Sequence, residues 1–351
     1  MTMMNFCRKM LKRIKLFVLY WTRIVFVKNK FKGIPIGTKI KANAEGYLAD
    51  QYVLYDFKHV DKNQYLSEFD WYRSRYINEP FDFSFNNKVV CAEMLKHHIR
   101  FAENYYIINK HVLLDFHHGP MKYEDVMATL EKEGKLVVKP FAMGKGNGVH
   151  LLTFENGRYY VDTEEYTYKN LVKYLKKLDG YLISEYIHQH EYSNKLYDRT
   201  TNTIRFITMR NTKTHEMELF FAVQRIGRFK TIPVDNGSKG GLVANINLET
   251  GELSEARCLQ ELGSWDVHPD SGNPIKGAFI PNWDGIKKEM LDVCKKIPFM
   301  DFIAWDLLIM EDGRPCVIEA NTSSGVNIIQ LWGGQKQDEL GDFFRHYGVI
   351  K

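Results

Sequence analysis

Two carboxylates near the C-terminal end of the chain occupy positions that a β-hairpin would bring face to face. Segment 302–321 reads FIAWDLLIMEDGRPCVIEAN, in which two apolar runs flank an Asp-Gly pair at 312–313. This pair favours a two-residue type I′ turn, because both turn positions need a positive φ. A turn centred there places Asp306 opposite Glu319, with Asn321 on the same face as Glu319. Two opposed carboxylates repel each other, so the arrangement favours a cation between them.

The side-chain types of this hairpin favour a hard divalent cation. The oxygen donors of Asp306, Glu319 and Asn321 suit Mg²⁺, with Mn²⁺ as an alternative, better than zinc. Two other interpretations stay open. The carboxylates could lie solvated on an edge hairpin, or they could form a pair that shares one proton.

A lysine within an apolar strand is the second chemical feature. In LVVKPFAMGKGNGVHLL, Lys139 lies in an expected strand at 135–140, just before Gly144, Gly146 and Gly148. A buried ammonium is costly unless it meets an anion, and glycine lets loop amides approach phosphate oxygens closely. The combination favours a nucleoside triphosphate site, although its spacing matches neither a Walker motif nor a dinucleotide-binding fingerprint.

The elements that must position these residues belong to a globular chain. Its 351 residues are 44% hydrophobic and 26% charged, enough for about two domains with a buried core. The five cysteines are scattered without a CxxC pair, so the sequence indicates neither a disulfide framework nor a structural zinc site, and we expect a cytoplasmic location. Apolar runs, charged helices and glycine turns alternate, which predicts an α+β (α/β) fold. The main expected strands are 135–140, 149–154, 181–187, 202–209, 217–226, 302–310 and 315–320, and the main helices are 88–100, 167–178 and 286–297.

The positive charge of the chain is concentrated at its N-terminus. Residues 1–32 contain nine Lys or Arg and no acid, whereas the rest of the chain holds 39 bases and 43 acids. The body is therefore mildly acidic, and we expect no nucleic-acid partner. Apolar residues in this segment follow a helical spacing at Phe6, Met10, Ile14, Phe17, Trp21 and Val25. The pattern predicts a basic amphipathic helix that contacts an anionic membrane surface, or alternatively one that packs on the body.

In order along the chain, these motifs resemble the ATP-grasp superfamily. The matching pieces are VVKP with its glycine loop, then SEYI, then the D…EAN hairpin. A closer likeness is to the sugar-transfer-associated ATP-grasp family, through SEYIHQHEYSN, NTIRFIT, AVQRIGR, DNGSKGGLVANINLETG and IAWDLLI…CVIEAN, over about residues 85–330. The resemblance implies two α+β lobes that clamp ATP, after an N-terminal helical and aromatic-rich extension.

The expected domains are a basic amphipathic helix at 1–32, a region at 33–120 that precedes the ATP-grasp fold, and an ATP-grasp domain at 121–351. Within that domain, the phosphate-flap lobe spans about 121–185 and the metal and substrate lobe about 186–351.

The resemblance also implies roles for individual residues. Lys139 matches the lysine on the α- and β-phosphates, and the three glycines match the phosphate flap. Glu185 matches the residue on the adenine amine, Tyr186 and the backbone near Ile187 match the rest of the hinge, and Glu191 is the candidate for the ribose. The Mg²⁺ ligands would be Asp306, Glu319 and Asn321. The residues expected to bind the γ-phosphate or an acyl-phosphate are Arg205, Arg225 and Lys239.

The activity that the resemblance implies is an ATP-dependent carboxylate–amine ligase that works through an acyl-phosphate. Its partners would be a carboxylate-bearing glycan or small molecule and an amine, with the protein at the inner face of the membrane if its N-terminal helix binds there. A glycan kinase that uses the same site and a nucleotide-binding scaffold of a polysaccharide-assembly complex are the alternatives.

Overall fold

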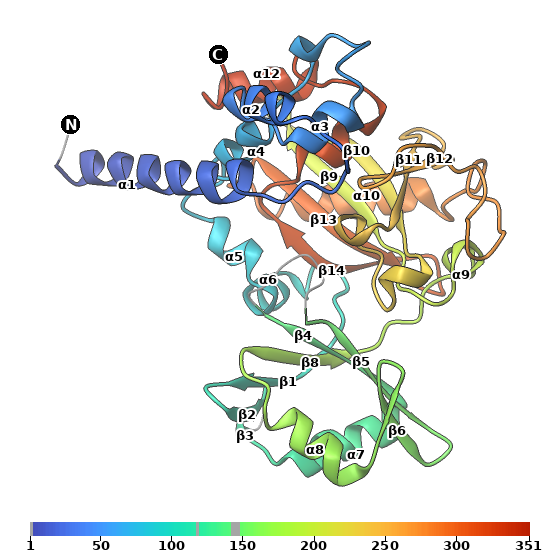
Figure 1. Ribbon diagram of the computed structural model, residues 1–351. Coiled ribbons are helices and arrows are strands. Elements are labelled where there is room, and N and C mark those ends of the chain that lie inside the picture. The colour runs from blue at the N-terminus through green and yellow to red at the C-terminus, as the bar shows by residue number, and fades with distance from the viewer. Residues whose placement is uncertain (1–2, 117–118, 142–147) are drawn as a thin grey trace.

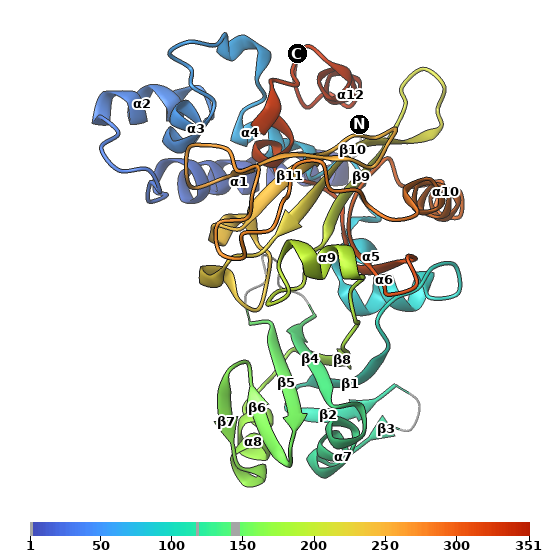
Figure 2. The same ribbon diagram turned by 90° about the vertical axis from the view of Figure 1, so that its right-hand side faces the viewer.

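The computed structural model describes residues 3–116, 119–141 and 148–351, which form two β-sheets in separate lobes (Figures 1 and 2). The smaller lobe contains an eight-stranded sheet in the order β3-β2-β1-β8-β4-β5-β6-β7. Its strands are β1 (Asn104–Asn109), β2 (Val112–Asp115), β3 (Gly119–Pro120), β4 (Lys135–Pro140), β5 (His150–Glu155), β6 (Arg158–Val161), β7 (Glu164–Tyr166) and β8 (Tyr181–Glu185). Helices α7 (Tyr123–Glu133) and α8 (Tyr168–Leu175) cover the face that points away from the larger lobe.

The larger lobe contains a six-stranded antiparallel sheet in the order β12-β11-β10-β9-β13-β14. The strands are β9 (Ile204–Arg210), β10 (Met217–Ile226), β11 (Leu242–Ile246), β12 (Leu253–Cys258), β13 (Phe302–Ile309) and β14 (Pro315–Asn321). One face packs against α10 (Trp283–Cys294), and the other against α11 (Val326–Ile329) and α12 (Glu339–His346). Strand β13 is buried along its whole length, so any polar side chain on it lies in the interior.

The N-terminal extension is helical and is docked on the larger lobe. It comprises α1 (Met3–Tyr20), a π-helical turn (Trp21–Val25), α2 (Ile36–Ala44), α3 (Ala49–Leu54), α4 (Glu68–Ser74), α5 (Asp82–Asn86) and α6 (Lys88–Leu95). Buried Leu66 joins the core formed by α11 and α12, and the Gln330 side chain bonds both the N–H and the carbonyl of Leu66, at 2.7 and 3.0 Å. Asn78 is buried and donates to the Phe302 carbonyl at 2.7 Å. The extension is therefore part of the larger lobe's core.

The division of the chain into lobes differs from the division expected from its sequence. Strands β1 to β3 pair into the same sheet as β4 to β8, so this lobe begins at Asn104 and a boundary at 120/121 falls inside the sheet. The helix expected at 88–100 ends at Leu95. The following segment instead extends toward β14, where Phe101 forms a bridge with Val317 and the Val317 N–H donates to the Arg100 carbonyl at 2.8 Å.

The carboxylate hairpin has the predicted pairing but not the predicted turn. Gly313 alone of the expected turn pair has a positive φ, +78°, and the Met310 N–H bonds the Arg314 carbonyl at 2.9 Å, which leaves a three-residue loop. A three-residue loop shifts the register by one residue, but a bulge at Ile318 shifts it back. Asp306 consequently lies opposite Glu319, as predicted.

Candidate nucleotide and metal site

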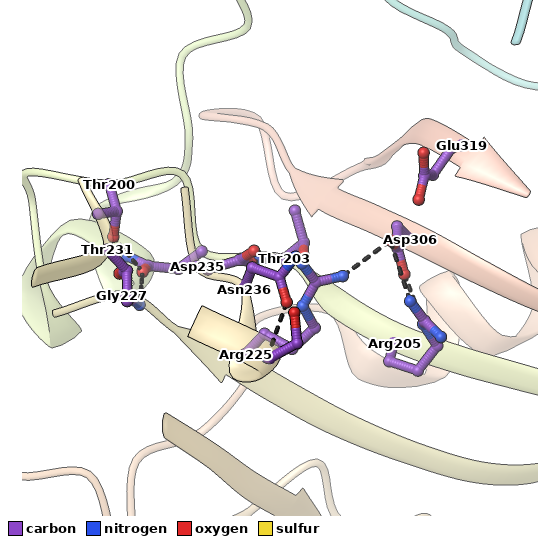
Figure 3. A network of polar contacts seen from close by, with 12 residues as sticks. Thr200, Thr203, Arg205, Arg225, Gly227, Thr231, Asp235, Asn236, Asp306 and Glu319 are labelled. Carbon is purple, nitrogen blue, oxygen red and sulfur yellow. Dashed lines mark hydrogen bonds and ion pairs between the residues drawn. The ribbon is translucent and has the colours of Figure 1, made fainter. Parts of the chain in front are cut away.

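Asp306 lies at the centre of a row of charged side chains on one face of the larger sheet. It pairs across strands with Glu319 on β14 and with Arg205 on β9, so three charged residues face each other on adjacent strands. Figure 3 shows this row, with the Glu319 carboxylate directed toward Asp306. Side chains directly opposite each other on neighbouring antiparallel strands lie close together, which is why the register alone assembles this row.

Two arginines hold the Asp306 carboxylate. Arg205 donates from Nε to Oδ1 at 2.6 Å and from Nη2 to Oδ2 at 3.2 Å, and Arg225 donates from Nη1 to Oδ2 at 2.7 Å. Burial by itself would raise the pKa of Asp306, but the two guanidinium groups hold that pKa well below its usual value. Asp306 is therefore ionised, and the hydrogen bond with Glu319 also lowers its pKa, which is compatible with a carboxyl pair that shares one proton.

The network of ion pairs extends into the loop after β10. Arg225 also donates from Nη2 to Asp235 Oδ1 at 2.5 Å, and Asp235 Oδ2 accepts from both the N–H and the hydroxyl of Thr203 at 2.6 Å (Figure 3). Burial favours the neutral form of Arg225, yet Asp235 and Asp306 raise its pKa above the usual value. Each of these buried charges has a partner of opposite sign, as burial requires.

The Glu319 side of the row is built differently, because it receives a lysine from outside the sheet. Lys88, the first residue of α6, bonds Glu319 Oε2 at 2.8 Å, and the Asn321 side-chain amide donates to Oε1 at 3.3 Å. The Lys88 N–H also donates to the Phe141 carbonyl at 3.3 Å, at the end of β4 in the other lobe. Helix α6 therefore touches both lobes where they meet (Figures 1 and 2).

Lys139 lies on β4 and is buried at this junction. Burial, with a contribution from nearby Lys88, lowers the pKa of the Lys139 ammonium to about 8, while Glu319 and Cys316 act in the opposite direction. The desolvated ammonium lacks enough negative charge around it, which is the environment in which an added anion is bound most strongly. Sequence reasoning predicted Lys139 but missed Lys88. The only local signal for Lys88 is that the preceding Asn87 caps α6 through the N–H groups of Val89 and Val90.

The hinge residues lie at the end of β8. The Glu185 carboxylate accepts from Arg100 Nη2 at 2.7 and 2.5 Å and from the Glu103 N–H at 2.9 Å, so most of its acceptor capacity is used within the protein. An adenine amine would have to share this carboxylate with Arg100. Tyr186 is partly buried, with its ring 5.1 Å from the ring of His188, and Ile187 is also partly buried. Arg100 was not expected from the sequence.

The remaining predicted site residues lie on other elements or outside the described structure. Glu191 begins α9 (Glu191–Leu196), and its exposed carboxylate pairs with Lys195 at 2.7 Å. Lys239 ends a 3₁₀ turn (Gly237–Lys239) that follows Asp235, and its side chain is exposed. The flap prediction for Gly144 and Gly146 lies outside the described residues. Gly148 has a φ of +72°, and a Cβ there would lie 2.7 Å from Tyr181 Oη, so the backbone and the neighbouring side chain both favour glycine.

The donor set can be tested against Mg²⁺. Glu319 and Asn321 supply oxygen atoms on one face of β14, and Asp306, already bound by two arginines, retains limited acceptor capacity beside them. Among residues whose placement is described, no group of three or more His, Cys, Asp or Glu side chains is arranged to hold a metal. The oxygen donors that the site offers are those of two carboxylates and one amide. It suits a magnesium ion that also uses nucleotide phosphates and water as ligands.

A model of the sugar-transfer associated ATP-grasp family matches residues 70–339, which is more than half of the chain. The chain belongs to this family. The assignment confirms the resemblance predicted from the motifs, including the ATP-grasp fold, and it supports an ATP-dependent ligase. The match starts within α4, so part of the helical extension is included in it.

Comparisons with individual proteins are more distant. No curated protein matches the sequence at a significant level. One similar solved structure is the biotin carboxylase domain of 2-oxoglutarate carboxylase from Hydrogenobacter thermophilus, in complex with ADP, magnesium and bicarbonate. It has 13% identity and a TM-score of 0.44, over 77% of this chain and 46% of that one. Another is D-alanine–D-alanine ligase from Bacillus anthracis, with 12% identity and a TM-score of 0.40, over 76% and 68% of the two chains. A third, N5-carboxyaminoimidazole ribonucleotide synthetase from Thermotoga maritima, has 12% identity and a TM-score of 0.35, over 68% and 42%. The chain thus spans less than half the length of two of these three structures.

Proposed function

We propose that the protein is an ATP-dependent carboxylate–amine ligase that forms an amide on a cell-surface polysaccharide or its precursor. The observation that carries this proposal is the convergence of four cationic side chains on the Asp306–Glu319 pair, contributed by both lobes: Lys88, Lys139, Arg205 and Arg225. A transferred phosphoryl group carries its charge on peripheral oxygens, and fixed cations stabilise that charge without a covalent protein nucleophile.

In the proposed reaction, a carboxylate oxygen of the acceptor attacks the γ-phosphorus of ATP, and the bond between that phosphorus and the β–γ bridging oxygen breaks. ADP leaves and an acyl-phosphate forms. The amine nitrogen then attacks the acyl carbon, the carbon–oxygen bond to phosphate breaks, and the amine loses a proton. The products are an amide, ADP and inorganic phosphate.

The charged residues of the site would have different roles in this reaction. Lys139 and Lys88 would hold the nucleotide phosphates at the lobe junction, because their ammonium groups lie there with Glu319 as the nearby carboxylate. Arg205 and Arg225 are oriented by Asp306 and Asp235, so they could meet an anion without reorganising. Glu319 and Asn321 would hold Mg²⁺, which when bound neutralises phosphate charge and polarises the γ-phosphate.

The acceptor class is proposed from the family description, not from a side chain. A uronic acid residue of a glycan supplies a carboxylate, and an amino acid supplies an amine. A sugar kinase would use the same cations but would leave the phosphoryl group on a hydroxyl. A nucleotide-binding scaffold would bind ATP without turning it over.

One experiment separates these three functions. The protein would be incubated with Mg-ATP, a uronic acid oligosaccharide whose carboxylates carry a heavy oxygen isotope, and hydroxylamine as the amine. A ligase transfers one labelled oxygen into inorganic phosphate and yields a hydroxamate, because the acyl-phosphate takes its bridging oxygen from the carboxylate. A kinase yields a phosphorylated sugar and no labelled phosphate, which would overturn the ligase proposal.

Binding of Mg-ATP should be measured first, since it needs no acceptor. Calorimetry on the wild type beside Lys139→Ala and Glu319→Gln tests the nucleotide site itself. We expect binding that depends on the metal and that both substitutions weaken. Binding without turnover by any uronic acid substrate would favour the scaffold, and no binding by the folded wild type would remove the site assignment.

A further inference from the structure

Helix α1 exposes its apolar side to solvent. Phe6 and Phe17 are 60% and 64% exposed, and the other large apolar side chains that share this side are also exposed: Met10, Leu11, Ile14 and Val18. Figure 1 shows that α1 extends sideways beyond the rest of the molecule, with the N-terminus at its outer end. An apolar strip of this length on a charged helix is unusual for a surface that faces only water.

The other side of α1 is the one that contacts the body. Lys12 lies over the ring of Tyr76, with Nζ 4.1 Å from the ring centroid, and Tyr20 donates to the Asn43 carbonyl at 2.8 Å. With 3.6 residues per turn, the direction of Lys12 and Tyr20 lies about 150° around the helix from the centre of the apolar strip. The strip therefore points away from the body, and packing on the body does not account for it.

Basic side chains border the strip on both edges. On a helical projection of 3.6 residues per turn, Arg8 and Lys15 lie along one edge, and Arg13 lies along the other. All three are exposed. The first acidic residue in the sequence is Glu45, so no carboxylate on α1 offsets this charge. Two copies of α1 packed strip to strip would bring like charges together, which disfavours a second copy as the occupant.

The attachment of α1 to the body is firm. The π-helical turn that follows it buries Ile24, and the Asn43 side chain donates to the carbonyls of Ile24 and Tyr47 at 3.1 Å. Tyr20 also packs edge-on against Phe69, with ring centroids 5.5 Å apart. Whatever α1 binds would therefore be held in a set orientation relative to the larger lobe.

We propose that α1 lies in the surface of an anionic lipid bilayer, with its apolar strip among the acyl chains and its bordering bases at the lipid phosphates. No helix of the described residues is long and apolar enough to cross a bilayer. An apolar strip along one side of a helix, bordered by bases, is typical of a helix that lies in the plane of the surface. Apolar burial and charge attraction act together in this mode, and either alone gives weaker attachment. This inference is independent of the reaction proposed above.

The test is flotation of the full chain with vesicles of equal parts phosphatidylglycerol and phosphatidylcholine, beside vesicles of phosphatidylcholine alone. We expect binding to the anionic vesicles that weakens with salt. The variant Phe6→Ser/Ile14→Ser/Phe17→Ser should lower the partition coefficient about a hundredfold. The variant Arg8→Gln/Arg13→Gln/Lys15→Gln should cause a similar loss on anionic vesicles and no loss on neutral ones.

A matched control replaces three exposed apolar residues elsewhere, Phe83→Ser/Val112→Ser/Leu262→Ser, and should bind as the wild type does. Circular dichroism of every variant reports that the fold is intact. Unchanged vesicle binding by the apolar variant would overturn the proposal. Equal binding of the wild type to both vesicle types would also overturn it. A wild-type dimer that the apolar variant converts to a monomer would identify a second copy as the occupant instead.

Discussion

Asp306 and Glu319 face each other on adjacent strands, but their surroundings differ in kind. Asp306 is buried, and its partners Arg205 and Arg225 come from β9 and β10 of the same sheet. Glu319 is partly exposed, and its partner Lys88 comes from a helix that also bonds the other lobe. The first carboxylate is thus fixed by the fold of one lobe, while the second depends on how two lobes meet. One half of the site is built before any ligand arrives, and the other half is available to be rearranged by one.

The largest effect expected from this difference is on stability at Asp306. Asp306→Ala leaves two largely buried guanidinium groups without this carboxylate, so we expect the free energy of unfolding to fall by about 3–5 kcal/mol. Urea denaturation measures it. Glu319→Ala, the matched change on the facing strand, should cost about 1 kcal/mol or less because Glu319 is partly solvated. Similar losses in both variants would show that the two carboxylates are equally structural.

The second effect is on turnover, and it concerns Glu319, the carboxylate whose loss should cost less stability. Glu319→Gln keeps the shape of the side chain but removes the charge that a metal needs, so we expect Mg-dependent ATP turnover to fall by at least about a hundredfold with the fold intact. Steady-state kinetics and circular dichroism report the two quantities. Turnover within a fewfold of the wild type would remove Glu319 from the metal site.

The third effect concerns the pH dependence of nucleotide binding through Lys139. Its pKa is about 8 in the free protein, and a bound phosphate would raise it. Between these two values the free amine is neutral and the bound one is charged, so binding takes up a proton and affinity falls as pH rises. Below about pH 8, Lys139 is charged in both the free and the bound protein, so the affinity no longer depends on pH through this residue. We expect a loss of up to about tenfold per pH unit above pH 8.

Calorimetry at about pH 9 in two buffers of different ionisation enthalpy counts the protons taken up when Mg-ATP binds. The variant Lys139→Met should take up fewer protons and bind with less pH dependence. An affinity for the wild type that is constant across this range would mean that Lys139 does not meet the phosphates.

The smallest effect is expected at two glycines in the smaller lobe. Gly148 and Gly157 have nearly equal φ values, +72° and +74°, but a Cβ at Gly148 would meet Tyr181 Oη whereas one at Gly157 would meet nothing within 4 Å. Gly157→Ala should cost about 1 kcal/mol from its backbone alone. Gly148→Ala should cost about 1 kcal/mol more through crowding, and only this change should weaken Mg-ATP binding. If the two alanine variants lost equal stability and equal affinity for Mg-ATP, Gly148 would have no particular role at the lobe junction.

Local sequence patterns predicted the strands that carry the site. The strands expected at 135–140 and 217–226 have the same bounds in β4 and β10, because an apolar run or alternation marks them and glycine or charged residues end them. The opposition of Asp306 and Glu319 followed from the same reasoning. These features depend on residues within a few positions of each other, or on one short hairpin.

Features that depend on distant segments could not be read this way. Arg100 reaches Glu185 across 85 positions, and Lys88 reaches Glu319 from a helix far earlier in the chain. The pairing of β1 with β8 placed β1, β2 and β3 in the smaller lobe, although nothing near these strands in sequence indicates that sheet. Family resemblance indicated which residues meet ATP, but it did not indicate which partners hold those side chains inside the protein.

The bulge at Ile318 has a consequence for how freely the hairpin tip can change. One extra residue on β14 compensates for the three-residue loop at 311–313. The length of that loop therefore does not by itself fix the pairing of Asp306 with Glu319. A two-residue turn at 312–313, with Ile318 paired in the ladder, would give the same opposition of Asp306 and Glu319, so two tip geometries are compatible with one register. The tip is therefore a place where a reporter peptide or a new specificity loop could be grafted, because the bulge can keep Asp306 opposite Glu319 when the loop changes.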